Sequence, residues 1–80
     1  MEYVSKINYL EVYNRWKLIL RAWKVDDNSF CIEYYLTEER KCDLTRKEFI
    51  FYLKKLNIPE KYIDNSFGEV DFLFDKTETD

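Results

Sequence analysis

The spacing of apolar and polar positions predicts a helix over residues 45–57. Its apolar side chains recur every three or four residues, as one face of a helix requires: Phe49, Tyr52, Leu53 and Leu56. Thr45 and Glu48 have the spacing of a capping box, and Pro59 ends the pattern. Because proline also suits the first turn of a helix, we expect a second, short helix over residues 59–65.

Alternation of apolar and polar residues predicts strands in two other segments. In residues 69–75, Val70, Phe72 and Phe74 share one face and carboxylates the other, with Leu73 as the exception. Residues 15–37 read as a β-hairpin whose inward positions are Trp16, Leu18, Leu20 and Ala22 on one strand and Phe30, Ile32, Tyr34 and Leu36 on the next. The last residues, 76–80, are expected to fray.

The register of this hairpin follows from arithmetic. For the two inward sets to share a face, the numbers of paired residues must sum to an even value such as 56, which pairs Leu20 with Leu36. A simple even-length loop over the turn residues DDNS gives 55 instead. The hairpin therefore needs a three-residue loop or a bulge, for which Asn28 in the left-handed region is suitable.

The first part of the chain also fits a helix. Asn8 and Glu11 have capping-box spacing, and one apolar stripe follows: Tyr9, Val12, Tyr13, Trp16, Ile19, Leu20 and Trp23. We favour the hairpin over residues 15–37, with a short helix within residues 5–13. The prediction is then a single α+β domain over residues 1–80, in which an antiparallel sheet (hairpin 15–37 and strand 69–75) packs against the helices 45–57 and 59–65.

Size and composition are compatible with one compact domain. A chain of 80 residues buries only about 60% of its unfolded surface. Fifteen aromatic residues (seven Tyr, six Phe and two Trp) compensate, because each buries a large area.

Charge is unevenly distributed along the chain. The segment from Glu60 to Asp80 holds seven carboxylates and two lysines, whereas residues 1–59 hold eleven basic and nine acidic groups, so the net charge of −3 comes from the last quarter. An acidic face repels nucleic acid and attracts basic surfaces. We therefore expect a larger partner protein with a basic groove. The expected contact residues are the carboxylates Asp64, Glu69, Asp71 and Asp75 and the aromatic anchors Tyr62 and Phe67.

Several kinds of chemistry are excluded by composition. The chain has no histidine, which removes the usual general base and the commonest transition-metal ligand. Its single glycine, Gly68, rules out glycine-rich phosphate loops. Cys31 and Cys42 are too few soft ligands for a structural zinc site, and Cys31 lies in an apolar run typical of a packed thiol. We expect no enzyme activity, no metal and no cofactor.

The beginning of the sequence indicates a location. MEYVSKI lacks a basic stretch followed by an apolar run, so we expect neither a signal peptide nor a membrane span. The expected location is the cytosol, where both cysteines are reduced.

One cluster combines basic and aromatic residues and offers an alternative binding site. It comprises Arg15, Lys17, Arg21 and Lys24 with Trp16 and Trp23. Such a surface binds single-stranded nucleic acid by phosphate contacts and base stacking. In the hairpin, however, Arg21 and Lys17 are expected near Glu33 and Glu38 across the sheet, where opposite charges pair.

These observations favour a non-enzymatic inhibitor that binds a larger protein. In size, acidity and bias to Lys, Asn, Ile, Tyr and Phe, though in no motif, the chain resembles phage or mobile-element proteins that block a host nuclease or defence complex, such as anti-CRISPR proteins. An immunity or antitoxin protein that neutralises a toxin is the first alternative, and a small nucleic-acid-binding module using residues 15–24 is the second. A homodimer formed through an edge strand is a further alternative.

Overall fold

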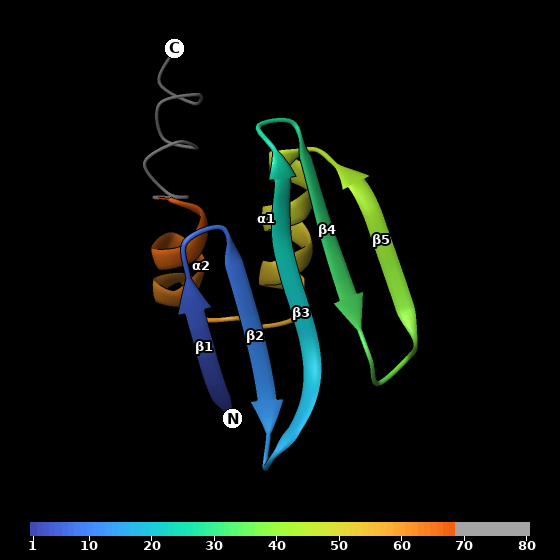
Figure 1. The fold of residues 1–80 in the computed structure, drawn as a ribbon, viewed down its shortest axis with the longest axis vertical. Coiled ribbons are helices and arrows are strands. Elements are labelled where there is room, and N and C mark those ends of the chain that lie inside the picture. The colour runs from blue at the N-terminus through green and yellow to red at the C-terminus, as the bar shows by residue number, and fades with distance from the viewer. Residues whose placement is uncertain (69–80) are drawn as a thin grey trace.

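Residues 1–68 fold into a five-stranded antiparallel sheet with two helices on one face (Figure 1). The computed structural model describes residues 1–68. Each strand pairs with the next one along the chain, and both helices follow the sheet. The elements are β1 (Glu2–Lys6), β2 (Tyr9–Asn14), β3 (Lys17–Asp26), β4 (Ser29–Tyr34), β5 (Glu39–Leu44), α1 (Arg46–Lys55) and α2 (Glu60–Phe67). This is the predicted small α+β fold. The predicted strand 69–75 and the predicted frayed end at 76–80 lie outside the described residues.

The hairpin predicted over residues 15–37 is confirmed as β3 and β4, with a shifted register. Ala22 pairs with Ile32 and Leu20 with Tyr34, so the paired numbers sum to 54 and not to 56. The even sum is achieved by a bulge between Lys24 and Asp26. The expected left-handed conformation of Asn28 is wrong. Its backbone N–H instead donates to Asp26 Oδ1 at 2.8 Å in the turn.

Three residues expected to face inward from this hairpin are outside the core: Leu18 pairs with Tyr13 on the side of the sheet away from the helices, and Trp16 and Leu36 are exposed. Trp16 lies in the turn before β3, and Leu36 lies in the loop after β4. Ile19 and Leu20 are both buried, because a register irregularity between β2 and β3 interrupts the alternation of β3 there. Ile19 therefore adds apolar area to the core in place of the residues that are absent from it.

The short helix predicted within residues 5–13 is wrong, because this segment forms most of β1 and β2 and the turn between them. Leu10 and Val12 are buried towards the helices, while Glu11 points to the opposite side of the sheet. Asn8, expected to cap a helix, instead lies in the β1–β2 turn with a φ of 63°. The helical stripe considered for this segment therefore does not form.

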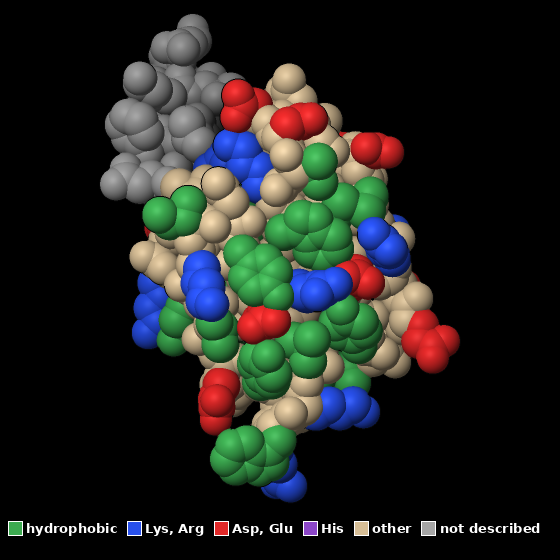
Figure 2. Space-filling model, in the orientation of Figure 1, with side chains coloured by type: hydrophobic (Ala, Val, Ile, Leu, Met, Phe, Trp, Pro, Cys, Tyr) green, Lys and Arg blue, Asp and Glu red, His purple; other side chains and the backbone are tan. Residues whose placement is uncertain are grey.

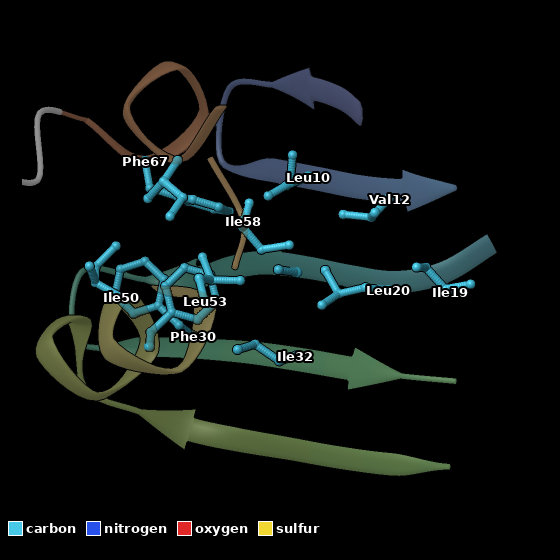
Figure 3. Packing of buried hydrophobic residues seen from close by; sticks show 13 residues of the cluster. Leu10, Val12, Ile19, Leu20, Phe30, Ile32, Ile50, Leu53, Ile58 and Phe67 are labelled. Atoms are coloured by element: carbon cyan, nitrogen blue, oxygen red, sulfur yellow. The ribbon is translucent and has the colours of Figure 1, made fainter. Parts of the chain in front are cut away.

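The hydrophobic core lies between the sheet and the helices (Figure 3). Phe49 and Leu53 of α1 are fully buried, as the helical spacing predicted. Phe49 stacks on Phe30 of β4, with ring centroids 4.6 Å apart, and meets Phe67 of α2 edge-on at 4.7 Å. The sheet contributes Leu10, Val12, Ile19, Leu20, Ala22, Phe30 and Ile32, and the helices and the segment between them contribute Phe49, Ile50, Leu53, Ile58, Ile63 and Phe67.

Helix α1 starts at the predicted capping box. Glu48 N donates to Thr45 Oγ1 at 3.2 Å, and Thr45 N donates to Glu48 Oε1 at 2.9 Å. These two bonds satisfy backbone N–H groups that the helix itself leaves without a partner. Neither α1 nor α2 is long and apolar enough to cross a membrane, and no other helix is found in the described part of the chain.

Helix α2 is fixed to the β1–β2 hairpin by partly buried hydrogen bonds. Ser66, only 4% exposed, bonds through Oγ to Ser5 Oγ at 2.6 Å and donates to the carbonyl of Tyr9 at 2.9 Å. The backbone N–H of Asn8 donates to the Ser66 carbonyl at 2.7 Å. The C-terminal end of α2 therefore lies at the β1–β2 turn, at the opposite end of β2 from the β2–β3 turn (Figure 1).

Candidate functional site

In the described part of the chain, the helices leave one side of the sheet uncovered, which we call the open face. Side chains alternate across a sheet, so the open face carries the strand neighbours of the buried residues. Figure 2 views this side and shows hydrophobic side chains at its centre with charged groups between them. The pairing of the strands assigns to it, among others, Val4, Tyr9, Glu11, Tyr13, Leu18, Arg21, Trp23, Cys31, Glu33, Arg40 and Cys42.

A row of alternating charges crosses the open face. Each member pairs with the next in the strand register, and we call the set the charged row: Glu11, Arg21, Glu33 and Arg40. Arg21 Nη2 donates to Glu33 Oε1 at 2.7 Å. This bond lowers the pKa of Glu33 and raises that of Arg21. Arg21 Nε is buried and has no hydrogen-bond partner among the described residues.

Aromatic side chains flank the charged row. The Arg21 guanidinium lies 5.2 Å from the ring centroid of Trp23, a cation–π distance. Tyr9 and Tyr13 both donate to the Glu11 carboxylate, at 2.5 and 3.2 Å, and Tyr35 donates to Glu33 at 3.3 Å. Burial, together with the bond to Glu11, raises the pKa of Tyr9 to about 12. The three tyrosine rings are therefore held in place by hydrogen bonds to the charged row.

The two cysteines lie next to each other on the open face. A bulge between the Phe30–Leu44 and Ile32–Lys41 pairs places Cys31 beside Cys42, and both are free thiols. Burial and the neighbouring Cys42 raise the pKa of Cys31 to about 11. Cys31 therefore stays protonated at neutral pH, which makes it a poor nucleophile.

The β2–β3 turn presents an exposed tryptophan. Trp16 is 94% exposed, and both Arg15 and Trp16 have positive φ, 53° and 49°. Asn14 and Lys17 pair on either side of them, so these two residues form a two-residue hairpin turn. Such turns with positive φ at both positions favour Asn-Gly, because larger side chains are strained there. We call Arg15, Trp16 and Lys17 the hairpin tip.

The six residues of the predicted basic and aromatic cluster do not form one surface. Arg21 and Trp23 lie on the open face, while Arg15, Trp16 and Lys17 form the hairpin tip. Lys24 pairs in register with the buried Phe30, so it belongs to the other side of the sheet, and its Nζ pairs with Asp27 at 2.9 Å. The expected proximity of Arg21 and Glu33 is confirmed.

The predicted acidic site is only partly within the described residues. Asp64 and Tyr62 lie on α2. The Tyr62 ring stacks on the Tyr3 ring, with the ring centroids 4.4 Å apart. Phe67 is only 5% exposed and packs in the core, so its predicted role as an exposed anchor is wrong. Its position four residues after the buried Ile63 explains this, since both lie on one face of α2. Glu69, Asp71 and Asp75 lie outside the described residues.

Two further features were missed by the sequence reasoning. The first is the aromatic open face, for which the alternation of Tyr9, Glu11 and Tyr13 was an available signal. The second is a cavity of about 520 Å³ between β5 and α1, with Phe51 at its rim, 67% exposed. Its lining residues are Lys41, Leu44, Lys47, Glu48, Phe51 and Tyr52.

Within residues 1–68, the acidic and cysteine side chains form no group of three or more that could hold a metal ion. Comparison of the chain with protein-family models, with curated proteins and with solved structures found no match.

Proposed function

We propose that this chain is a non-enzymatic protein-binding domain that inhibits a larger protein by occupying part of its surface, and that the hairpin tip anchors the contact. The observation that supports this proposal is the exposure of Trp16 on a strained turn. Strain of this kind persists where the surrounding structure imposes it, and it is concentrated at functional positions.

The chemistry of the hairpin tip suits a protein pocket. Tryptophan is the residue most enriched among those that dominate binding energy, and one indole buries roughly 150–250 Å². Arg15 and Lys17 flank Trp16 and form no ion pair with any residue in the described range. The complementary pocket is therefore apolar, with carboxylates at its rim.

The acidic segment, Glu60 to Asp80, supplies a second, separate contact in this proposal. Asp64 lies on α2, whose C-terminal end is at the opposite end of the sheet from the hairpin tip (Figure 1). The carboxylates of Glu69, Asp71 and Asp75 would meet the basic groove of a cytosolic nuclease or defence complex, and a toxin is the alternative target. Because the two contacts use different residues, they can be tested independently.

The test is capture of a partner by the immobilised full-length chain, followed by affinity measurement with the identified protein. We expect Trp16→Ala to weaken binding by about 30-fold, as loss of a dominant anchor worth roughly 2 kcal/mol implies. Phe51→Ala is the matched control, because it also removes an exposed aromatic ring, but from α1. Equal binding by wild type and Trp16→Ala would overturn the role of the hairpin tip.

A third variant tests the acidic contact in the same assay. It combines Glu69→Gln, Asp71→Asn and Asp75→Asn, which keep side-chain shape and remove charge. We expect weaker binding that becomes less salt-dependent. Unchanged affinity would remove the acidic segment from the proposed contact.

Nucleic-acid binding is the second candidate function, and one observation favours it: the exposed Trp16 lies between two cationic side chains. Stacking of a base on the indole with phosphates at Arg15 and Lys17 would bind a single strand. Fluorescence titration with oligothymidine at two salt concentrations distinguishes this function, because phosphate contacts weaken steeply with salt.

A further inference from the structure

We propose that the open face binds the open face of a second copy of this chain, in a dimer whose two-fold axis runs parallel to the strands. This inference goes beyond the proposed function and uses different residues, so either can fail without the other. It rests on the order of charges in the charged row and on the size and composition of the uncovered sheet.

The charged row is complementary to itself when its order is reversed. From β2 to β5 it reads Glu11, Arg21, Glu33, Arg40, with alternating sign. A two-fold axis parallel to the strands, between β3 and β4, reverses the order of the strands in the facing copy. Each carboxylate then faces a guanidinium: Arg21 faces the partner's Glu33, and Glu11 faces the partner's Arg40. Such pairs add hydrogen bonds between ionised groups to those within each copy.

The charged row also favours this axis over a two-fold axis that runs across the strands. An axis running across the strands would place Glu11 over the partner's Glu11 and Arg21 over the partner's Arg21, and like charges in a buried interface are strongly unfavourable. The strand-parallel axis also places the large Trp23 over the partner's Cys31, which is small, because these two residues pair in register on β3 and β4. Large side chains facing small ones allow close packing.

The open face is large enough for a specific dimer. Five strands about 4.8 Å apart and roughly six residues long cover about 500 Å² of flat surface, hence about 1,000 Å² for two copies, near the lower limit of specific interfaces. Two sheets packed in this way form a sandwich whose inner layer combines the charged row with the aromatic residues that flank it. An interface of this size predicts a reversible, concentration-dependent dimer.

A second copy fits the open face better than a nucleic acid does. The charged row holds as many carboxylates as guanidiniums, so it offers no excess positive charge to a phosphate backbone. The pair formed by Arg21 and Glu33 already neutralises the centre of the face.

The test is sedimentation velocity of the full-length chain over a 100-fold range of concentration, with Trp23 fluorescence as a second readout. Trp16→Phe leaves Trp23 as the single tryptophan and does not touch the open face. We expect a monomer–dimer equilibrium, with a blue shift of Trp23 emission as dimer forms. A monomer at all concentrations, or a dimer without change in Trp23 emission, would overturn the proposal.

Two charge reversals locate the interface. Arg40→Glu places like charges opposite the partner's Glu11 twice per dimer and should raise the dissociation constant at least tenfold. Lys47→Glu makes the same change in charge on α1, at an exposed position on the other side of the sheet, and should leave the dissociation constant unchanged. Equal effects of the two reversals would contradict the proposed interface.

A charge exchange separates the dimer contact from folding. Arg21→Glu alone breaks the pair with Glu33 in each copy and between copies, and should yield monomer. The double variant Arg21→Glu, Glu33→Arg gives a row of two carboxylates followed by two guanidiniums, which is still complementary to its own reverse. We expect the double variant to dimerise again, with circular dichroism confirming the fold. A folded double variant that stays monomeric would count against the charged row as the determinant.

Discussion

At the scale of the residue, the surroundings of a side chain decide its role more than its chemical type. Trp16 and Trp23 are seven positions apart, yet one is almost fully in water and the other lies under the Arg21 guanidinium on the open face. Phe51 is exposed on α1, whereas Phe67 is in the core. Such contrasts allow each surface to be tested against a matched residue elsewhere.

The charge pair at the centre of the open face predicts a pH-dependent contribution to stability. Arg21 lowers the pKa of Glu33, so the folded state favours the ionised carboxylate. The stabilisation is therefore fully present above the unfolded pKa of about 4.3 and is lost as pH falls through the lower folded pKa. Glu33→Gln should cost about 0.5–1 kcal/mol at pH 7, a small value because water reaches the 40%-exposed Arg21 side chain.

Urea unfolding between pH 7 and pH 3 measures this contribution. The difference between wild type and Glu33→Gln should be constant above about pH 5 and shrink below it. Glu38→Gln, an exposed change in the β4–β5 loop, is the control. A difference that persists unchanged at pH 3 would mean that Glu33 stabilises the fold by something other than its charge.

Sequence reasoning succeeded for residues whose neighbours in the chain determine their position and failed for residues positioned by distant contacts. Thr45 and Glu48 could be predicted because the capping box is a local interaction. Phe67 could not be placed from charge distribution alone, because the carboxylates around it in the sequence suggested a surface. Its burial depends on Phe30 and Phe49, which are far from it in the sequence.

At the scale of the element, the helices were more predictable than the first two strands. A cap, an apolar stripe and a terminating proline all indicated α1. In β2, by contrast, the open face is also aromatic, so Tyr9 and Tyr13 obscure the alternation of Leu10 and Val12 and create an apparent helical stripe. The register of β3 and β4 depends on the position of the bulge. The sequence was compatible with more than one position, so the register could not be predicted from it.

The strained hairpin tip predicts opposite effects on stability and on binding. Replacing Arg15 and Trp16 by Asn and Gly supplies the residues that prefer positive φ at both turn positions. We expect the double variant Arg15→Asn, Trp16→Gly to raise the free energy of unfolding by about 1 kcal/mol. Urea denaturation measures this gain, and the partner assay should show the loss of binding.

Trp16→Ala separates the two effects in this element. It removes the indole and leaves a residue with a side chain at positive φ, so binding should fall while stability changes by less than about 0.5 kcal/mol. If the Asn-Gly turn were less stable than the wild-type turn, the indole would have a structural role, and the strain at this position would no longer indicate a function.

At the scale of the whole molecule, one core connects the sheet to both helices. Phe30 of β4, Phe49 of α1 and Phe67 of α2 are in mutual ring contact. Phe67→Ala should therefore lower the free energy of unfolding by about 3–5 kcal/mol, which is a large part of the roughly 5–15 kcal/mol available to a domain. Thermal unfolding followed by far- and near-ultraviolet circular dichroism should show one transition at a reduced temperature.

Phe51→Ala is again the control, since this ring is 67% exposed on the same layer of helices. It should cost less than about 1 kcal/mol. Two separate transitions in the Phe67→Ala variant, one for the sheet and one for the helices, would show that the layers fold as independent units and would contradict a single core.

The position of the hairpin tip at one end of the sheet has a consequence for binding strength (Figure 1). Rotation about an axis parallel to the strands keeps that end in place, so the proposed dimer carries both Trp16 side chains at the same end. A target that displays its pocket twice is then held by two tips, and the second contact forms at an effective concentration on the order of millimolar. A target bound by both tips of the dimer dissociates only when both contacts are broken at the same time.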